Sequence, residues 1–365
     1  MMKEFLKRYK VEIETIGPVH IGSGESIKKK EWLLDNRNSK AVIADTGKLF
    51  AFLKKNRLLD EFEKFFLGNS GNLQMWLKEH GIFEKDYREF EKYTLDTSGV
   101  DLRDRQIRDI ALCTKDAYGM PYIPGSSLKG AIRTAILAKK IKETDYHDPE
   151  IKDQIYSYRG RNKKRFLSNQ SRNLNQEIFY TGNFDQKNPK NIVNDIMRGI
   201  RVSDSTPIDC SNLTLCQKVD VNTRDKETNL PILRECIKPG CIISTELTID
   251  TGITDISCEY IRQAIKEFLA DYNEMFLKYF RNETLYKGSF IYLGGGVGFA
   301  SKTVTNQLLA GEPNRVKHIG ELIDKTTGKS QHSSNKDVNP HIVKLTEYDR
   351  DLIQMGACSI EFAPV

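Results

Sequence analysis

Strand-like and helix-like patterns alternate along this chain without the regular rhythm of a parallel, doubly wound sheet. Short segments with alternating or continuous apolar residues are typical of β-strands, and they occur at 10–19, 41–44, 104–113, 199–205, 213–219, 232–237, 241–250 and 359–363. Apolar residues recur at helical spacing across 46–90, after residue 125 and across 258–280. Because strands and helices follow one another irregularly, we predict an α+β fold with an antiparallel sheet core.

Two stretches stand apart from the predicted strands. Residues 46–90 are typical of a small helical insertion. Residues 142–195 are polar, basic and rich in Asn and Gln, with weak periodicity, and we predict that they form a mobile insertion. These features divide the chain into an N-terminal part, 1–141, the polar insertion, and a C-terminal α+β half, 196–365.

Charge is distributed unevenly along the chain. The sequence has 56 basic and 50 acidic residues, and its formal net charge is +6. Basic residues cluster at 28–30, at 139–142 and, most densely, at 159–165, whereas 60–101 is rich in acid. A surface that binds a polyanion needs such a local excess. Runs of charge more often mark solvated faces, so this pattern is only a hint.

Composition excludes several other classes of protein. No run of 18 or more apolar residues is present to span a membrane, and the amino terminus is charged where a signal peptide would be apolar. We therefore expect a cytoplasmic protein that does not contact membranes. The seven cysteines form no CxxC pair, and the closest spacings lack an adjacent histidine. We predict reduced, mostly buried thiols, no metal site and no cofactor.

The strongest local signal is the segment PYIPGSSLKGAIRTAI, residues 121–136. A Pro-Gly turn precedes Ser126 and Ser127, where we expect a helix to begin with its first N–H groups unbonded and pointing outward. A helix start carries partial positive charge and binds phosphate. Lys129 and Arg133 lie four residues apart on the same helix face. The segment therefore predicts an anion site with two cations beside it; the alternative is a capped surface helix with solvated cations.

Two glycine-rich segments are further candidates for contact with a ligand. HIGSGES follows the first predicted strand and precedes a lysine triplet, and YLGGGVGFASK follows a later one. Glycine lets the backbone approach a ligand, lysine can reach a phosphate, and an aromatic ring such as Phe299 or Tyr292 can stack on a base. The candidate binding residues are His20, Gly22, Ser23, Gly24 and Lys28 in the first segment, and Gly294, Gly295, Gly296, Phe299 and Lys302 in the second. The alternatives are a plain tight turn and a glycine-rich hairpin.

Groups suited to catalysis are few. His20 can act as a general acid or base, but no second histidine is near it in sequence. No carboxylate cluster suggests a pair of metal ions. Asp204 follows a predicted strand, where it can orient an arginine. These observations favour a binding protein over an enzyme.

Taken together, the motifs resemble the RAMP superfamily, the repeat-associated RNA-binding proteins of CRISPR systems. PYIPGSSLKGAIRTAI looks like its central helix motif, VHIGSGES like its amino-terminal loop and GGGVGFASK like its carboxy-terminal loop, in the expected order. RVSDSTPI, CQKVD and ILRECIKPG resemble the branch formed by the fifth subunits of Csm effector complexes. The resemblance spans 19–302, although 46–90 and 142–195 contribute nothing to it.

The resemblance implies a ferredoxin-like, RNA-recognition-type core of one or two modules, the first within 1–141. It implies a non-catalytic RNA-binding subunit of a type III-A CRISPR Csm ribonucleoprotein. Such a subunit caps the backbone filament at the 3′ part of the CRISPR RNA, and is needed for guide maturation and assembly in antiviral defence. The implied partners are CRISPR RNA, target RNA, the repeated backbone subunit and the small subunit, with a host trimming nuclease as a further possibility.

Two other activities of the superfamily stay open. A metal-independent endoribonuclease that processes the guide would use His20. A backbone subunit that cuts target RNA would use a loop aspartate, and Asp109 falls at that position when aligned without gaps from the central motif, with Asp35 as another candidate. The fifth subunits are not regarded as the target nuclease, so we assign no catalytic residue.

Overall fold

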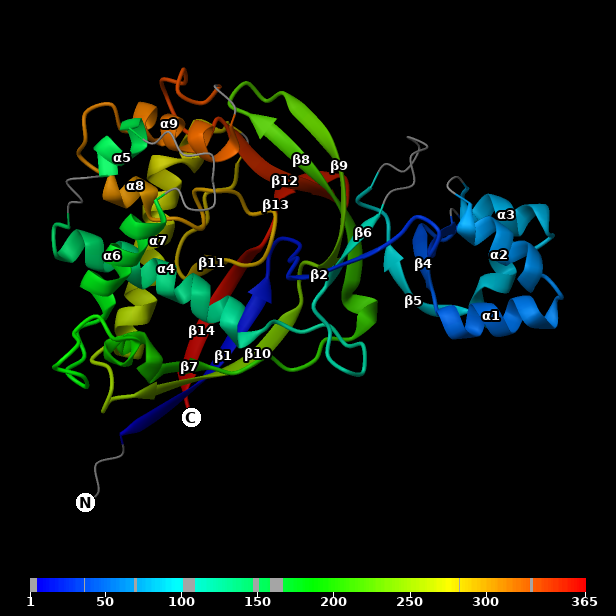
Figure 1. Ribbon diagram of the computed structural model, residues 1–365, viewed down its shortest axis with the longest axis horizontal. Helices are drawn as coiled ribbons and strands as arrows, with labels where there is room; N and C mark the ends of the chain where they lie inside the picture. The colour runs from blue at the N-terminus through cyan, green and yellow to red at the C-terminus, as the bar shows by residue number, and fades with distance from the viewer. Residues whose placement is uncertain are drawn as a thin grey trace.

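Strand β1 (Leu6–Thr15) is the centre of the sheet that organises the computed structural model (Figure 1). Val11 and Ile13 are fully buried, and the charged residue between them, Glu12, faces solvent, as expected for a half-buried strand. In register, Ile13 lies opposite a residue of β10 (Ile242–Asp250) on one side and of β14 (Ala357–Pro364) on the other. The structure describes residues 5–35, 37–68, 71–100, 109–146, 151–157, 167–281, 283–328 and 331–365.

The order of this first sheet is β11-β14-β1-β10-β7, and each of its pairs is antiparallel. Strands β7 (Ile200–Val202) and β11 (Phe290–Tyr292) form its edges. Helix α4 (Gly125–Glu143) connects towards β7, and helix α7 (Cys258–Met275) follows β10. The order β14-β1-β10-β7, with these two helices, is that of a ferredoxin-like βαββαβ unit. The predicted α+β class with an antiparallel core is confirmed.

Helix α7 illustrates how the sequence specifies this layer. The Ser257 side chain accepts a hydrogen bond from the Tyr260 N–H and caps the helix. Ile261, Ile265 and Leu269 follow at spacings of four residues, and all three are buried. Helix α7 packs beside α4, and the two helices together cover one region of the sheet (Figure 1).

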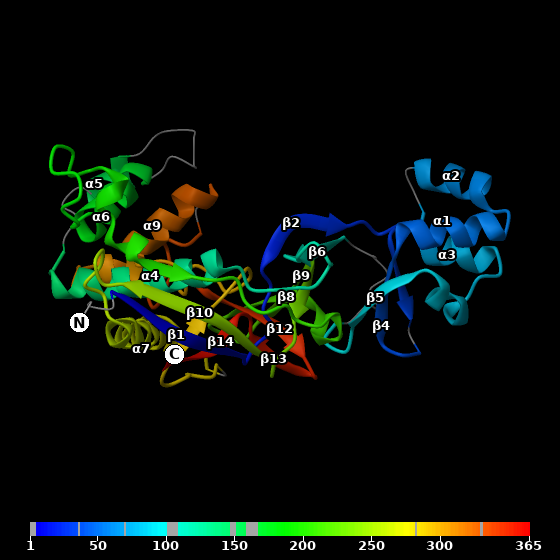
Figure 2. The ribbon, with the colours of Figure 1, turned by 90° about the horizontal axis from the view of Figure 1, so that it is seen from below.

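A second sheet curls away from the first (Figure 2). Its order is β2-β6-β9-β8-β5-β4-β3, and its strands are β2 (Gly22–Ile27), β3 (Trp32–Asp35), β4 (Lys40–Ala44), β5 (Glu91–Asp96), β6 (Ile110–Cys113), β8 (Leu213–Asn222) and β9 (Glu227–Ile237). Strand β12 (Ile342–Tyr348) also pairs with β8, and β13 (Asp351–Gln354) pairs with β12. β6 pairs with β9 in parallel, as β5 does with β8, whereas β2 pairs with β6 antiparallel.

The predicted helical insertion is confirmed. Helices α1 (Thr46–Lys55), α2 (Leu59–Leu67) and α3 (Leu73–Glu79), with a 3₁₀ helix at Glu84–Glu89, lie together at one end of the molecule (Figures 1 and 2). Their buried side chains form a separate cluster with residues of β3 and β4. The insertion therefore has a small core of its own.

The polar stretch is partly helical where the structure describes it, although its sequence shows only weak periodicity; its mobility stays a prediction. Its first residues end α4, and α5 (Ile151–Ser157) and α6 (Ser168–Phe179) follow. Leu174, Ile178 and Phe179 of α6 join the main core. Their apolar stripe is hidden in the sequence among Asn and Gln residues. The basic cluster at 159–165 lies outside the described residues.

The proposed division at residues 141 and 195 stays a prediction. Each sheet contains strands from both of the proposed halves: β1 pairs with β10 and β14, and β6 pairs with β9.

The remaining helices are α8 (Thr305–Leu308), α9 (Arg315–Thr327) and 3₁₀ helices at Ile192–Asn194, Ile196–Gly199, Cys210–Asn212 and Leu277–Tyr279. All seven cysteines are free thiols, and five of them are buried, as predicted. Across the described ranges, no helix combines the length and apolar character needed to cross a bilayer.

Candidate functional site

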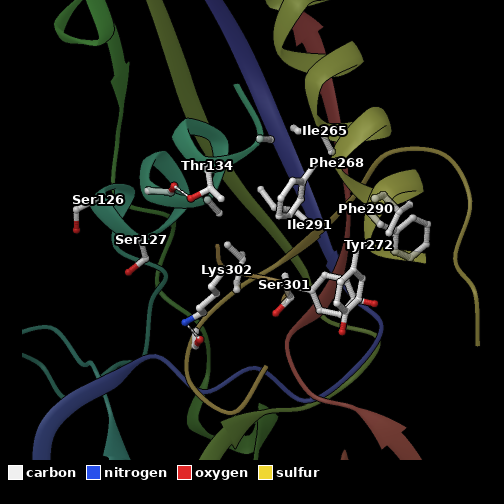
Figure 3. A pocket seen from close by; sticks show the side chains of 17 residues that line it. Ser126, Ser127, Thr134, Ile265, Phe268, Tyr272, Phe290, Ile291, Ser301 and Lys302 are labelled. Atoms are coloured by element: carbon white, nitrogen blue, oxygen red, sulfur yellow. Dashed lines mark hydrogen bonds between the residues drawn. The ribbon is translucent and has the colours of Figure 1, made fainter. Parts of the chain in front are cut away.

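A cavity of about 250 Å³ opens between the first turns of α4, the middle of α7 and the loop after β11 (Figure 3). Its polar lining residues are Ser126, Ser127, Thr134, Ser301 and Lys302, and its aromatic lining residues are Phe268, Tyr272, Phe290 and Tyr292. Gly294 also lines it. The fold therefore brings the central helix motif and the carboxy-terminal glycine loop to one place, although they are far apart in the sequence.

The start of α4 differs from the expectation. The N–H of Gly125 donates to Asp204 Oδ1 at 2.8 Å, and the N–H groups of Ser127 and Leu128 donate to the Pro124 carbonyl at 2.9 and 3.3 Å. Of these first amides, that of Ser126 alone has no partner within the described part of the chain. The prediction of several free, outward amides was wrong, because the Asp204 carboxylate already occupies the helix start. Among the described residues, Asp204 holds this amide and pairs with no arginine.

Arg133 is not a free cation. Its Nη1 pairs with Asp195 Oδ2 at 3.0 Å, its Nη2 donates to Asn175 Oδ1 at 3.0 Å, and its guanidinium lies 4.1 Å from the centre of the Phe179 ring. These partners belong to α6 and the turns after it, within the polar stretch. Contact between Arg133 and RNA stays a prediction, and nothing in the sequence pointed to these partners.

Of the candidate cations near this cavity, Lys129 and Lys302 have no carboxylate partner among the residues that the structure describes. Lys129 is partly buried, and burial lowers its pKa, an effect to which the nearby Arg133 adds. Lys302 lies exposed at the mouth of the cavity, where its Nζ donates to the Gly294 carbonyl (Figure 3). Neighbouring atoms partly desolvate the Lys302 ammonium group, and this lowers its pKa. Both charges would therefore gain from an arriving anion.

The carboxy-terminal glycine loop is packed against the segment that follows β1. The N–H of Gly295 donates to the His20 carbonyl at 2.6 Å. A Cβ atom on Gly294 would lie 2.1 Å from that same oxygen, and φ at Gly294 is +79°. Only glycine fits this approach and this conformation. The loop is therefore packed closely against the protein, and its Gly294 forms part of the cavity wall.

The two aromatic residues proposed to stack on a ligand have other contacts. Tyr292 is buried, and its hydroxyl donates to Gln354 Oε1. Tyr292 therefore forms the base of the cavity and is not free to stack at its mouth. Phe299 is partly buried, and it packs against a cluster that contains Leu309 and Ile319. It does not line the cavity.

The first glycine segment forms strand β2 rather than a loop. Gly22, Ser23 and Gly24 are exposed at the edge of the second sheet, paired with β6 across a bulge. The Ser23 hydroxyl donates to the Leu112 carbonyl at 3.3 Å, and Lys28 pairs with the exposed Asp109 at 2.8 Å. Pairing with β6 explains why a glycine-rich run is extended here.

His20 is buried, and this distinguishes it from the exposed residues that follow. Its Nδ1 lies 2.8 Å from the Glu235 carbonyl oxygen, and burial lowers its pKa. An RNA at the surface cannot reach this ring without a rearrangement. Its backbone carbonyl, which holds the glycine loop, is its contribution to the site.

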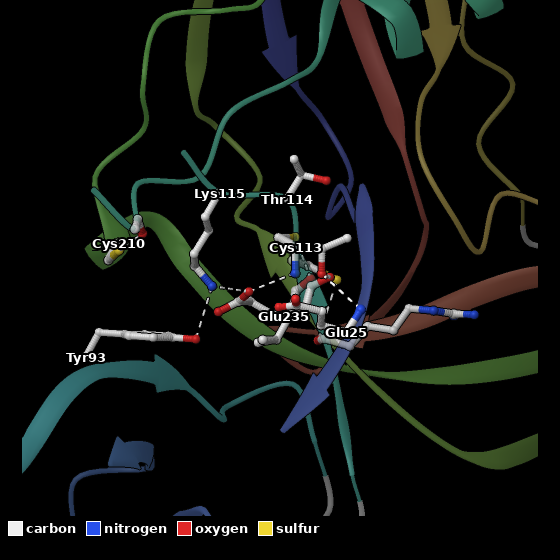
Figure 4. Close-up of polar contacts among 12 residues, drawn as sticks. Glu25, Tyr93, Cys113, Thr114, Lys115, Cys210 and Glu235 are labelled. Carbon is white, nitrogen blue, oxygen red and sulfur yellow. Dashed lines mark hydrogen bonds and ion pairs between the residues drawn. The ribbon is translucent and has the colours of Figure 1, made fainter. Parts of the chain in front are cut away.

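A buried polar network lies beside His20 and was not singled out from the sequence (Figure 4). The Glu235 side chain is fully buried; its Oε2 accepts from Lys115 Nζ at 2.5 Å and from the Cys113 N–H at 2.8 Å. Lys115 Nζ also lies 3.1 Å from the Tyr93 hydroxyl. These residues come from three separate stretches of the chain, so no local pattern could have revealed them. The network ties β5, β6 and β9 together.

Among the described residues, neither candidate catalytic aspartate lies in a group that could bind a metal ion. Asp35 accepts hydrogen bonds from the N–H groups of Arg37 and Asn38 and from the Asn38 side chain, so it caps the turn after β3. Asp109 directly precedes β6. Within the described residues, no three His, Cys, Asp or Glu side chains are grouped so that they could hold a metal ion.

Comparisons with known proteins extend over both halves of the chain. The model of the RAMP superfamily matches residues 12–331. A Streptococcus thermophilus protein named CRISPR system Cms protein Csm5 is 31% identical, over 84% of this chain and 82% of its own length. The Mycobacterium tuberculosis (strain ATCC 25618 / H37Rv) protein of the same name is 26% identical over 98% of both chains.

Two solved structures are similar in fold. One is a chain of a Csm–crRNA–target RNA ternary complex of a type III-A CRISPR-Cas system, with a TM-score of 0.65 and 19% identity, covering 98% of this chain and 100% of that one. The other is the crystal structure of T. onnurineus Csm5, with a TM-score of 0.60 and 20% identity, covering 95% of this chain and 99% of that one.

Proposed function

Since the chain belongs to the RAMP superfamily and, within it, to the Csm5 proteins of type III-A CRISPR systems, we propose that it binds guide RNA as a non-catalytic subunit of a Csm ribonucleoprotein. The observation that carries this proposal is the convergence of Ser126, Ser127, Gly294 and Lys302 around one cavity. These residues belong to motifs that lie far apart in the sequence, at 121–136 and 292–302, and a shared ligand is the simplest reason for both to meet there.

The RNA backbone is the part of the guide that this surface suits. Lys129, Lys302 and the free N–H of Ser126 can contact phosphates, and the hydroxyls of Ser126 and Ser127 can contact phosphate or sugar oxygens. Such contacts fix the path of the chain and do not read its sequence. The exposed strand β2, with Gly22, Ser23, Gly24 and Lys28, is a second strip along which the RNA can run. Gly295, Gly296 and Phe299 act indirectly, by shaping the loop.

We extend the proposal to the place of the subunit in the particle. A fold relative lies in a complex with crRNA and target RNA, and this supports both RNAs as partners. We propose that the chain caps the backbone filament at the 3′ part of the CRISPR RNA, beside the repeated backbone subunit and the small subunit, in the cytoplasm. There it would support assembly and guide maturation in antiviral defence, by presenting the 3′ end to a host nuclease.

The test of RNA binding is its dependence on salt. For single-stranded RNA, the logarithm of affinity should fall linearly with the logarithm of salt concentration, and each lost phosphate contact should reduce the slope by about 0.7. Lys129→Ala and Lys302→Ala should each do so for unrelated RNA sequences. Lys64→Ala, which removes an exposed lysine from the helical insertion, is the matched control. An unchanged slope in the Lys129→Ala, Lys302→Ala double variant would contradict the proposal.

Burial of His20 argues against guide cleavage by this residue. Purified protein should leave repeat RNA intact in EDTA. A defined cut that His20→Ala abolishes would instead establish a metal-independent endoribonuclease.

A role in cutting target RNA is tested in the assembled complex. The ion pair between Asp109 and Lys28 and the turn capped by Asp35 give both aspartates structural partners. Periodic target cleavage should therefore survive Asp109→Ala. Loss of one of the cuts after this change, in a particle of normal composition, would make Asp109 a catalytic residue.

A further inference from the structure

The cavity beside α4 differs in character between its mouth and its interior. Ser126, Ser127 and Lys302 bring hydroxyls and an ammonium group to the mouth (Figure 3). Side chains of α7 and β11 line the interior, and four of the lining residues are aromatic: Phe268, Tyr272, Phe290 and Tyr292. An entirely apolar groove would suit a peptide side chain, whereas this one has an ammonium group and hydroxyls at its entrance.

The aromatic side chains are held in place by one another. The Tyr272 ring packs edge-on against Tyr292, with 5.0 Å between ring centres. Phe290 is stacked on Tyr286 at 4.7 Å with an angle of 10° between the rings. Phe268 and Phe290 are only partly buried, so faces or edges of both rings remain accessible from the cavity. Such fixed rings lose little conformational entropy when they receive a planar ligand.

Polar atoms within the cavity are already oriented by the protein. The Ser301 hydroxyl donates to the Val297 carbonyl at 2.7 Å, and the Thr134 hydroxyl donates to the Gly130 carbonyl at 3.0 Å. Each oxygen therefore keeps its capacity to accept a hydrogen bond from a ligand. The exocyclic amino and ring N–H groups of nucleobases are donors of this kind.

The size of the cavity limits what it can hold. At about 250 Å³ it is smaller than the roughly 300–1,000 Å³ typical of sites for drug-sized ligands. One ring system fits in it, and a folded segment of RNA does not. A planar, partly polar ring carried on a polyanion matches both the interior and the mouth.

We propose that this cavity receives a single unstacked base of the RNA whose phosphates pass Lys302. The inference rests on the proposed guide-RNA binding and deepens it, because it adds a base contact to a surface otherwise devoted to the backbone. Every base can stack on an aromatic ring, so the pocket would fix the position of one nucleotide of the RNA without selecting its base. An apolar side chain of a neighbouring subunit is the competing occupant, and Lys302 and the serines at the mouth disfavour it.

The test compares RNA with a sugar-phosphate chain of the same length in which every nucleotide is abasic. Gly130 lines the cavity and is exposed on α4, and an added Cβ would meet no atom within 4 Å. Gly130→Phe should therefore fill the cavity from its mouth. We expect it to weaken the binding of intact RNA by about tenfold, the usual scale for one stacked base, and to leave abasic binding unchanged. Ala270→Phe, which adds the same ring at an exposed position of α7 outside the cavity, should change neither affinity.

A second variant shows whether the effect of the first is due to the cavity or to misfolding. Phe268→Ala removes one wall of the cavity, and it should cause the same selective loss for intact RNA. If intact and abasic RNA lose affinity equally in both variants, or if neither loses any, the base pocket is wrong while guide binding stands. If wild-type protein binds neither polymer, the proposed function itself fails. If the variants keep normal RNA binding but no longer join the Csm particle, the occupant is a protein side chain and the proposal is overturned.

Discussion

The two glycine-rich segments have similar compositions and opposite physical roles. Gly22 and Gly24 lie on an exposed edge strand, and at Gly24 a Cβ atom would meet nothing within 4 Å. Gly294 and Gly296, by contrast, lie against the His20 backbone and the Met355 side chain, although Gly24 shares their positive φ angle. At Gly24 only the backbone conformation favours glycine, whereas at Gly294 both the conformation and the close packing require it. The comparison teaches that a glycine cluster predicts close approach of the backbone, but not whether the approaching group is the ligand or the protein itself.

The lysines beside the two segments also differ in their surroundings. Lys28 is exposed and shares its charge with Asp109, whereas Lys302 is held at a cavity mouth without a carboxylate partner among the described residues. A cation in fixed position loses less entropy on binding an anion than a mobile one that must also leave its partner. We therefore expect the second segment to dominate RNA affinity and the first to add a weak, salt-sensitive contribution.

The largest expected effect concerns the glycines themselves. Gly294→Ala should lower the free energy of unfolding by roughly 3 kcal/mol, because it combines a backbone clash with an unfavourable φ. Gly24→Ala should cost only about 1 kcal/mol, since its φ is +89° but its surroundings are open. Urea denaturation of both variants measures the difference. Equal losses would show that the two segments are not physically distinct.

The next effect is on RNA affinity. Lys302→Ala should weaken binding of single-stranded RNA by about tenfold at low salt, on the scale of a charge-assisted hydrogen bond. Lys28→Ala should weaken it by about threefold, and raised salt should remove most of that effect. Titrations of both variants against one RNA at two salt concentrations decide the order. A larger loss for Lys28→Ala would place the main contact on β2 and reverse the comparison.

Sequence reasoning predicted the fold better than the details of the site, for a physical reason. The alternation in β1 and the apolar stripe of α7 are local patterns, so strands and helices could be placed from them. The partners of α4 are not local: Asp204 bonds its first amide, and Asp195 and Asn175 hold Arg133. A free amide or a free cation is therefore a property of the tertiary structure, and a motif alone cannot show it.

A smaller effect comes from His20, which joins the two glycine segments. Burial lowers its pKa below the unfolded value of 6.5, so protonation favours the unfolded chain. The stability due to neutral His20 is fully present above pH 6.5 and is lost as the pH falls through the lowered pKa. The difference in unfolding free energy between wild type and His20→Gln should therefore shrink as pH falls from 8 towards 5.

His80 in the helical insertion provides the matched control for this pH dependence. Its hydrogen bond to the Trp76 carbonyl, and then that to Glu61, raise its pKa. The stabilisation by charged His80 is fully present below the unfolded pKa and is lost as pH rises through the raised one. The difference between wild type and His80→Gln should thus grow as pH falls. The same sign for both histidines would mean that His20 is not buried between the segments.

The smallest expected effect is at Asp109, the partner of Lys28. The side chains of Asp109 and Lys28 are 47% and 62% exposed, so water screens their attraction, and the ion pair adds little to the free energy of unfolding. Asp109→Asn should leave the urea midpoint unchanged within error, and it should raise RNA affinity slightly by releasing Lys28. A clear loss of stability would mean that the edge formed by β2 and β6 is as rigid as the glycine loop, and the contrast between the two segments would then reside in their glycines alone.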